Sequence, residues 1–367
     1  MATPLTSRDR LERVMRGKPV DRVPIHLWNV NPFHAAPRPE WQPLYDLVRR
    51  YELDSVVPWW YDRVCPVPTH SAIVREIDAE WYERETVIET PDGVLSERDL
   101  CSRRGRPGYR TKHLVQNVAD ARRWLSIPAP PPPETKGYSE LVERVGDRGL
   151  VHVYVDEPMY VAHSTMGSEL WGIWLHDERA LLHAMVGKAA DASQSAVRRC
   201  IERGLGPLFG WYGPEVCIPP LASPADFDEF VARYDRPLID LVHDAGGIFQ
   251  VHCHGDMHPV LERFVAMGVD CLNPIEPPPV GRLTLADAKR RVAGRMTLEG
   301  GVETALFQME SPETVARAVE AAMAAGKPGG RFILAPCATH DHWPDMGLHI
   351  AANYAVFVEV GLRVSPY

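Results

Sequence analysis

Short runs of β-branched and aromatic residues alternate with longer amphipathic runs along most of the chain. Eight of the short runs predict buried strands, at residues 20–29, 54–60, 150–158, 207–215, 246–253, 269–276, 295–301 and 331–336. Helical sequence follows each run; after the fifth, apolar residues recur at Val260, Leu261, Phe264 and Met267. Because buried strands that alternate with helices form parallel sheets, eight such units predict a closed (β/α)₈ TIM barrel.

The alternative architecture is an open, doubly wound sheet. No G-x-G-x-x-G follows the first predicted strand, so the usual cofactor-binding mark of that fold is missing. We therefore expect one barrel domain over residues 1–367, with an amino-terminal elaboration.

Two segments interrupt the regular alternation. Residues 76–100 change to a period of two around Thr90-Pro91-Asp92-Gly93, which predicts a β-hairpin insertion. Residues 128–134 form a proline run, which we interpret as a stiff spacer within the domain rather than a linker between domains.

Charge and composition exclude several classes of protein. A formal net charge of −9 leaves no basic surplus for binding nucleic acid or an anionic membrane. Seven unevenly spaced cysteines do not resemble a disulfide framework, and no signal peptide or membrane-spanning stretch is evident. We expect a soluble, cytoplasmic enzyme that acts on a small molecule.

The candidate metal ligands lie at the carboxyl ends of two predicted strands. His252 and His254 are two residues apart in an extended segment, so both side chains should face the same side, and Cys337 ends the last strand. Three such ligands with an open fourth position are typical of catalytic zinc. In the alternative interpretation the histidines bind an anionic substrate by hydrogen bonds, and His340 or His342 competes for the role of ligand.

Other polar and aromatic residues fall at strand ends, where a barrel carries its chemistry. Their candidate roles are catalytic acid or base for Glu299, Glu276 and Asp62, and substrate contact for Glu157, Tyr212, Trp60 and Trp211.

Several stretches resemble the uroporphyrinogen decarboxylase superfamily, which includes zinc-dependent, corrinoid-linked methyltransferases. They are residues 8–28 (RDRLERVMRGKPVDRVPIHLW), the central segment 222–277, LEGGV at 298–302 and ILAPC at 333–337. The resemblance implies a TIM barrel with ligands at His252, His254 and Cys337, although the methyltransferase branch has Cys where this chain has His254. The arginine-rich substrate loop of the decarboxylase branch is absent, since residues 29–41 contain only Arg38.

The resemblance therefore implies a zinc-dependent methyltransferase that works with a separate corrinoid protein, and a homodimer is a further expectation. Two alternatives stay open: a decarboxylase or lyase of a small carboxylated substrate, and a barrel that binds a ligand without catalysis.

Overall fold

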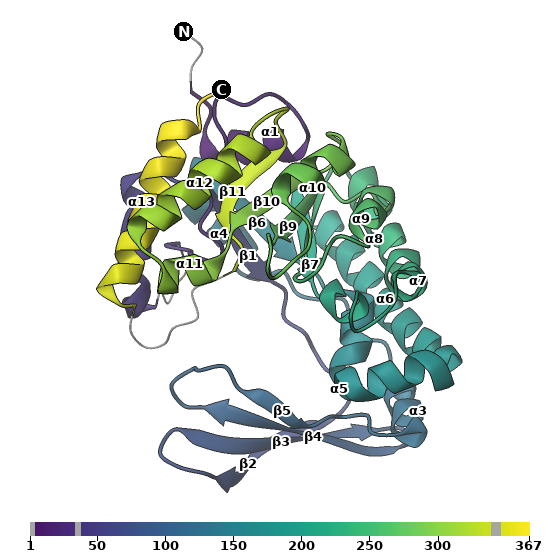
Figure 1. The fold of residues 1–367 in the computed structure, drawn as a ribbon. Coiled ribbons are helices and arrows are strands. Elements are labelled where there is room, and N and C mark those ends of the chain that lie inside the picture. Colours follow the sequence, from purple (N-terminus) through teal and green to yellow (C-terminus); the bar gives the residue numbers. More distant parts are fainter. Residues whose placement is uncertain (1–3, 34–37, 339–345) are drawn as a thin grey trace.

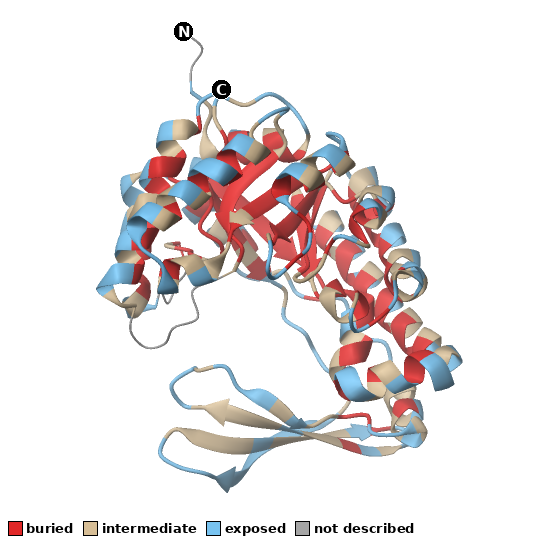
Figure 2. Cartoon of the chain, viewed as in Figure 1, coloured by how far each residue is buried: buried red, intermediate tan, exposed pale blue. Residues whose placement is uncertain are grey.

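The structure is a computed structural model, and it describes residues 4–33, 38–338 and 346–367. Figure 1 shows a large body of strands and helices, with a smaller antiparallel sheet set apart from it. The strands at the centre of the large body are buried, whereas the separate sheet is mostly exposed or half-buried (Figure 2).

Seven parallel strands form the centre of the large body. They are β1 (Ser55–Trp60), β6 (Gly149–Tyr154), β7 (Leu208–Tyr212), β8 (Ile248–His252), β9 (Cys271–Ile275), β10 (Thr297–Val302) and β11 (Phe332–Pro336). Their order in the sheet is their order in the chain, and every neighbouring pair is parallel. The predicted α/β class with a curled parallel sheet is thereby confirmed, and seven of the eight predicted strands are present.

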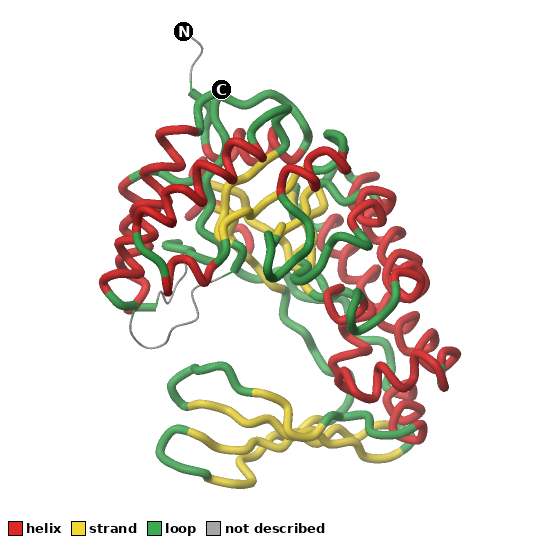
Figure 3. The backbone as a smooth tube through the Cα atoms, in the orientation of Figure 1, coloured by secondary structure: helices red, strands yellow, loops and turns green. Residues whose placement is uncertain are grey.

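Helices surround this sheet (Figure 3). They are α1 (Ser7–Met15), α2 (Gln42–Arg50), α3 (Val118–Ser126), α4 (Tyr138–Val145), α5 (Pro158–Asp177), α6 (Arg179–Glu202), α7 (Pro224–Phe227), α8 (Arg233–Asp244), α9 (Leu261–Met267), α10 (Leu285–Val292), α11 (Thr304–Met309), α12 (Pro312–Gly326) and α13 (Leu348–Val364). Shorter helical turns lie at Pro39–Trp41, Gly146–Arg148, Pro214–Cys217 and Asp228–Ala232. Within the described residues, none of the helices has the length and apolar character needed to cross a bilayer.

The eighth predicted strand, at residues 20–29, is irregular. Ile25 forms one parallel bridge to Leu334 of β11, whose N–H donates to the carbonyl of Pro24. On the other side, the N–H of Asp54, just before β1, donates to the carbonyl of Ile25. Pro24 has no N–H, and the N–H of Ile25 donates to the carboxylate of Asp54 rather than to a backbone carbonyl, so the segment lacks the donors of a regular ladder on this side. Its few hydrogen bonds nevertheless link the two edges of the curled sheet.

The amino-terminal end of the barrel is closed by α1. One apolar cluster contains residues from α1 and from six of the strands: Leu11, Val14, Met15, Val56, Leu150, Leu208, Ile248, Cys271 and Ile333. These strand residues face the barrel axis, and side chains two residues further along a strand face the same way. The inward positions nearer the carboxyl ends are therefore His152 and Tyr154 on β6, Gly210 and Tyr212 on β7, and Gln250 and His252 on β8.

The separate sheet has four antiparallel strands in the order β2 (Thr69–Glu76), β3 (Trp81–Thr90), β4 (Gly93–Ser102) and β5 (Tyr109–Lys112). The predicted turn lies between β3 and β4, where Thr90 pairs with Gly93. The sheet is larger than the predicted hairpin because it also includes β2 and β5. Every residue of β2 is exposed, so neither face of that strand has the apolar alternation from which a strand is predicted.

Candidate active site

His252 ends β8 and points into the barrel. The imidazole is only 7% exposed and lies between Trp28, whose ring is parallel at 4.7 Å between centroids, and Tyr212, whose ring is edge-on at 4.9 Å. Its Nδ1 is 2.6 Å from Oδ1 of Asn273 on β9. Because an amide oxygen only accepts, Nδ1 carries the proton and Nε2 keeps a lone pair. Burial and the neighbouring His254 lower the pKa of His252 to about 3, so the ring is neutral at pH 7.

His254 lies beside His252, with the two rings edge-to-face and their centroids 4.5 Å apart. Its Nδ1 is 2.9 Å from Oε1 of Glu276, which follows β9 directly. The other carboxylate oxygen of Glu276 accepts the backbone N–H of Gly255 at 2.6 Å. Both imidazoles are thus held through Nδ1 by residues at the end of β9, and the neutral form of each leaves Nε2 free of a proton.

The charges around His254 act in opposite directions on its pKa. Burial lowers it, but the hydrogen bond and charge of Glu276, together with the charges of Glu215 and Glu303, outweigh burial and raise the pKa above its ordinary value. The two imidazoles therefore differ, since His252 stays neutral while His254 is the readier to accept a proton.

Glu215 and Glu303 add to the acidic character of this region. Oε2 of Glu215 and Oε1 of Glu303 are buried, and neither atom has a hydrogen-bond partner within the part of the chain that the structure describes. Burial raises the pKa of Glu215, and burial together with the charge of Glu276 raises that of Glu303 to about 7. Partly buried carboxylates that repel one another, and that have no arginine or lysine partner among the described residues, favour the binding of a cation.

Cys337 follows the last residue of β11. Its backbone N–H donates to the carbonyl of Val302, so the strand pairing continues through this residue, and the alternation from Ile333 places its side chain on the inward face. The thiol is 1% exposed and lies 3.4 Å from the carbonyl oxygen of Ile275. Burial and the charge of Glu303 raise its pKa well above the ordinary value, so without a cation it is a neutral thiol.

These residues meet part of what a zinc site requires. Metal-binding histidines usually donate their second ring nitrogen to a carboxylate or carbonyl oxygen, as His252 and His254 do here. Among the described residues, however, no three His, Cys, Asp or Glu side chains are already gathered as metal ligands. The competing candidates His340 and His342 lie outside the described residues.

Two predicted acids lie deeper than the sequence suggested. Glu299 is fully buried inside the barrel, where it accepts a hydrogen bond from Gln250 and lies 2.6 Å from Nδ1 of His26. Glu157 is also buried and accepts the first N–H groups of α5, while burial raises its pKa to about 8. Glu299 is therefore enclosed by its partners in the barrel interior, and the carboxylate of Glu157 is engaged in capping α5.

The predicted aromatic contacts divide into two groups. Trp60, which is 48% exposed, stacks on Tyr154, and Tyr154 stacks in turn on Tyr212 beside His252. Trp211 faces the opposite way: it is fully buried and packs against Phe249. Trp211 and Tyr212 are neighbours on one strand and therefore point to opposite faces. Trp211 belongs to the core, whereas Trp60, Tyr154 and Tyr212 form the wall next to the histidines.

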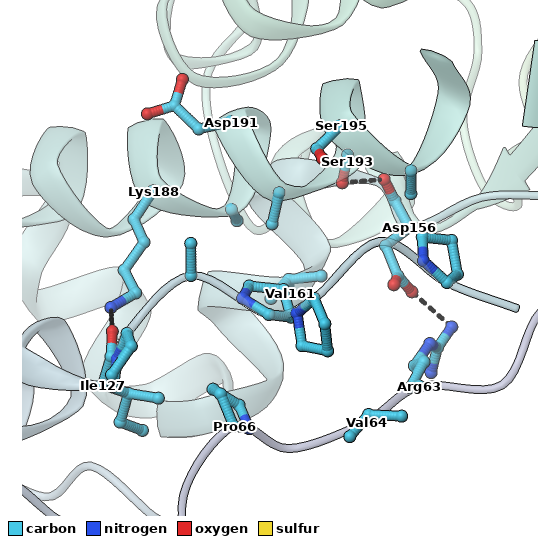
Figure 4. Close-up of a pocket in the computed structure, with 18 of the residues that line it drawn as sticks. Arg63, Val64, Pro66, Ile127, Asp156, Val161, Lys188, Asp191, Ser193 and Ser195 are labelled. Carbon is cyan, nitrogen blue, oxygen red and sulfur yellow. Dashed lines mark hydrogen bonds and ion pairs between the residues drawn. The ribbon is translucent and has the colours of Figure 1, made fainter. Parts of the chain in front are cut away.

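Asp62 lies at a different cavity, of about 570 Å³, beside the carboxyl ends of β1 and β6. Figure 4 shows that Lys188 of α6 reaches the carbonyl of Ile127 on one side, while Arg63 pairs with Asp156 on the other. The proline run at 128–134 supplies much of the wall. None of the residues that line this cavity is one of the candidate metal ligands.

The structure adds site residues that were not predicted. They are Asn273, which is hydrogen-bonded to His252, and Glu303, which lies beside Cys337. Trp28, which covers His252, was expected only as one of several tryptophans near strand ends that line an aromatic pocket. Asn273, a polar residue inside the apolar run Cys271–Ile275, was a usable signal. Glu303 had none, because it stands immediately before α11, where an acidic residue is ordinary in any helix, although its side chain makes no capping hydrogen bond here.

Comparison with models of protein families shows to which family the chain belongs. A model of the family described as uroporphyrinogen decarboxylase (URO-D) matches residues 112–353. The chain belongs to this family. The predicted resemblance is thereby confirmed, although no curated protein matches the sequence.

Among solved structures, a methyltransferase from Methanosarcina mazei is similar over 97% of this chain and 99% of its own, with a TM-score of 0.61 and 18% sequence identity. At this identity the similarity shows a shared fold. A B12-independent methionine synthase from Shewanella sp. W3-18-1 is more distant, covering 76% of this chain and 73% of its own with a TM-score of 0.41 and 11% identity.

Proposed function

We propose that this protein is a methyltransferase-like enzyme that binds zinc through His252, His254 and Cys337 and activates a small substrate there. The observation that carries the proposal is the pair of imidazoles at the end of β8, each held through Nδ1 and each with Nε2 available to a cation. The fold shared with a methyltransferase supports the reaction class. Because one fold hosts many reactions, the residues of the site must carry the rest of the argument.

Zinc at this position supplies Lewis acidity, which lowers the pKa of a coordinated water, alcohol or thiol. Two neutral imidazoles and one thiolate leave the ion with a net positive charge, whereas one imidazole and two thiolates leave none. The more positive site favours an oxygen nucleophile or a carbonyl over a thiol substrate.

The surrounding residues of the chain have separate tasks. Trp28 and Asn273 orient His252, and Glu276 orients His254. The thiol of Cys337 must lose its proton before it can bind a cation, and Glu303, which is hydrogen-bonded to it and has a pKa of about 7, is placed to accept that proton.

The methyl donor, in this proposal, is carried by a separate corrinoid protein. The decarboxylase alternative receives no support from the charges of the site, because Glu215, Glu276 and Glu303 repel a carboxylated substrate. No arginine or lysine forms an ion pair with any of the three among the described residues.

Metal analysis of the purified protein tests the zinc site. We expect about one zinc per chain in the wild type, and loss of most of it in His254→Ala and in Cys337→Ser. The matched controls are His70→Ala and Cys65→Ser, which remove exposed side chains of the same types and should retain the metal. An absence of bound metal in the wild type, or equal metal in all variants, contradicts the zinc proposal.

Methyl transfer is tested separately with methylcobalamin as the donor and methanol or 2-mercaptoethanol as the acceptor, under anaerobic conditions. A decrease in methylcobalamin absorbance that occurs with the wild-type protein, but not with His254→Ala, supports methyl transfer as the reaction class. A zinc-loaded protein that leaves methylcobalamin unchanged with every acceptor contradicts it, and the ligand-binding alternative is then favoured.

A further inference from the structure

The interior of the barrel beneath His252 is unusually polar. TIM-barrel interiors are commonly layers of branched apolar side chains. Here His26, His152, Gln250 and Glu299 occupy this region, and each is at most 2% exposed. The carboxylate of Glu299 has hydrogen-bond partners in His26 and Gln250. Some other buried polar atoms of this region have no hydrogen-bond partner among the described residues.

Three side chains have buried polar atoms without partners. They are both ring nitrogens of His152, Oε1 of Gln250 and Nδ2 of Asn273; none makes a hydrogen bond of normal geometry to the described residues. Burial lowers the pKa of His152 to about 3, although the interaction of the ring with the backbone of Phe209 acts on the pKa in the opposite direction. The neutral ring therefore offers one N–H and one lone pair. Native proteins satisfy such atoms with protein groups or with ordered water.

The three side chains also lie close together. Gly210 of β7 pairs with Gln250 of β8, and a Cβ atom on Gly210 would lie only 2.5 Å from Nε2 of His152 and 2.0 Å from the carbonyl oxygen of Gln250. The His152 ring therefore lies over Gly210 and reaches toward β8. On the other side, His252 pairs with Asn273, so Gln250 and Asn273 are diagonal neighbours on the inward face.

We propose that His152, Gln250 and Asn273 form a buried binding site for one water molecule. The water accepts a hydrogen bond from Nδ2 of Asn273 and donates one each to Oε1 of Gln250 and to the unprotonated nitrogen of His152. Three hydrogen bonds are typical of a buried structural water. This arrangement satisfies one orphaned atom on each of three strands, β6, β8 and β9.

The water site has a consequence for His252. An Asn side chain can present either its oxygen or its NH₂ group to a neighbour, and the partner of the far end decides which. A water that accepts from Nδ2 directs Oδ1 of Asn273 toward Nδ1 of His252. It therefore keeps the proton on Nδ1 and the lone pair on Nε2. His152, Gln250 and Asn273 are thus positioning residues for His252. The inference rests on the proposed function in one respect, which is that His252 is a residue of the proposed metal site.

A high-resolution crystal structure of the chelator-treated full chain tests the water site directly. We expect ordered solvent density within hydrogen-bonding distance of Nδ2 of Asn273 and Oε1 of Gln250. A dry interior, or a direct contact that pairs these two atoms, overturns the proposal whether or not the protein binds zinc.

Ring ¹⁵N NMR of the same chelator-treated protein tests the positioning role. Wild-type His252 should be almost entirely the Nδ1–H tautomer, and His152→Phe should shift the tautomer ratio roughly fivefold or more, because the water loses one of its three partners. His349→Phe, the same substitution at an exposed position, should leave the ratio unchanged. An identical ratio in wild type and His152→Phe overturns the positioning role. Should His152→Phe fail to fold, Gln250→Met removes the acceptor on β8 and is judged by the same ratio.

Discussion

Trp28 lies parallel to His252, with 4.7 Å between the ring centroids and 9° between the ring planes. The indole belongs to the irregular segment at residues 20–29, which precedes β1 in the chain and lies between β11 and β1 in space. The imidazole ends β8, so this contact crosses the interior of the barrel. With Tyr212 edge-on and Asn273 hydrogen-bonded to Nδ1, the imidazole has little freedom to rotate. The fold therefore orients His252 before any ligand binds.

Trp28→Ala should destabilise the protein and loosen His252. The side chain is 4% exposed, and truncation of a buried tryptophan costs about 3–5 kcal/mol in unfolding free energy. Loss of the orienting contact should also weaken zinc binding about 10–100-fold, as other outer contacts to metal ligands do. Urea unfolding and a competitive zinc titration measure the two effects. Trp60→Ala, at an exposed ring, is the control, and unchanged zinc affinity in Trp28→Ala contradicts the orienting role.

Glu276→Gln should lower the pKa of His254, which an NMR titration of the ring measures. In the wild type this pKa is raised, so protonated His254 stabilises the fold at pH values below its ordinary pKa, and that stabilisation is lost as the pH rises through the folded-state value. The stability difference between wild type and Glu276→Gln should therefore be largest on the acidic side of neutrality. A difference that grows above pH 7 would show that His254 is not the group responsible.

Glu303→Gln should remove a pH dependence of the same sign as that of His254, but in a lower pH range. The pKa of Glu303 is raised to about 7, so the folded state retains a proton that the unfolded state releases nearer pH 4.5. Its contribution to stability is present below the lower value and is lost as the pH rises toward 7. Since glutamine cannot ionise, Glu303→Gln should be more stable than the wild type above pH 7. Glu310→Gln, at an exposed position, serves as the control in thermal unfolding at several pH values.

Gly210→Ala should be among the most damaging single-methyl additions to the chain. The new Cβ would meet the backbone oxygen of Gln250 at 2.0 Å, and the paired strands cannot move apart without breaking their hydrogen bonds. We expect a loss of several kcal/mol, at or above the usual ~1–3 kcal/mol of an overpacked core.

The matched comparison is Gly172→Ala in α5, where an added Cβ meets no atom within 4 Å. Alanine in a helix should be more stable than glycine by about 0.5–1 kcal/mol. Chemical unfolding of the two variants should therefore give changes of opposite sign, and a well-folded Gly210→Ala protein would contradict the close approach of β7 and β8.

The sequence predicted the regular parts of the barrel because their physical signals are local. Seven strands were visible as short apolar runs followed by helical spacing, and the His-x-His pair was visible at the end of one of them. The segment around Ile25 was predicted as a strand from its apolar residues, but it forms a single bridge, because the N–H of Ile25 donates to the side chain of Asp54 instead of to a neighbouring strand. The strand β2 was missed because all of its residues are exposed and no apolar alternation marks it, and β5 was missed because it is only four residues long and mostly polar.

The site could be predicted less completely, because its contacts join strands that are distant in sequence. His252 and His254 lie together as expected, but the burial of Glu299 and of Trp211 depends on which face of a strand each occupies near its end. A shift of one residue in a predicted boundary exchanges these faces. The partnerships of Asn273 with His252 and of Glu303 with Cys337 depend on barrel register, which no local pattern records.

The bridge between Ile25 and Leu334 joins two positions separated by most of the polypeptide. Contacts of this kind form slowly, since the intervening chain must first be ordered. During synthesis the segment that carries Trp28 has no β11 to pair with until nearly all of the barrel has been translated, and His252 is left without its indole cover for the same time. We therefore expect acquisition of the ligand geometry to be among the last steps of maturation, so that a nascent or truncated chain lacking β11 does not capture metal.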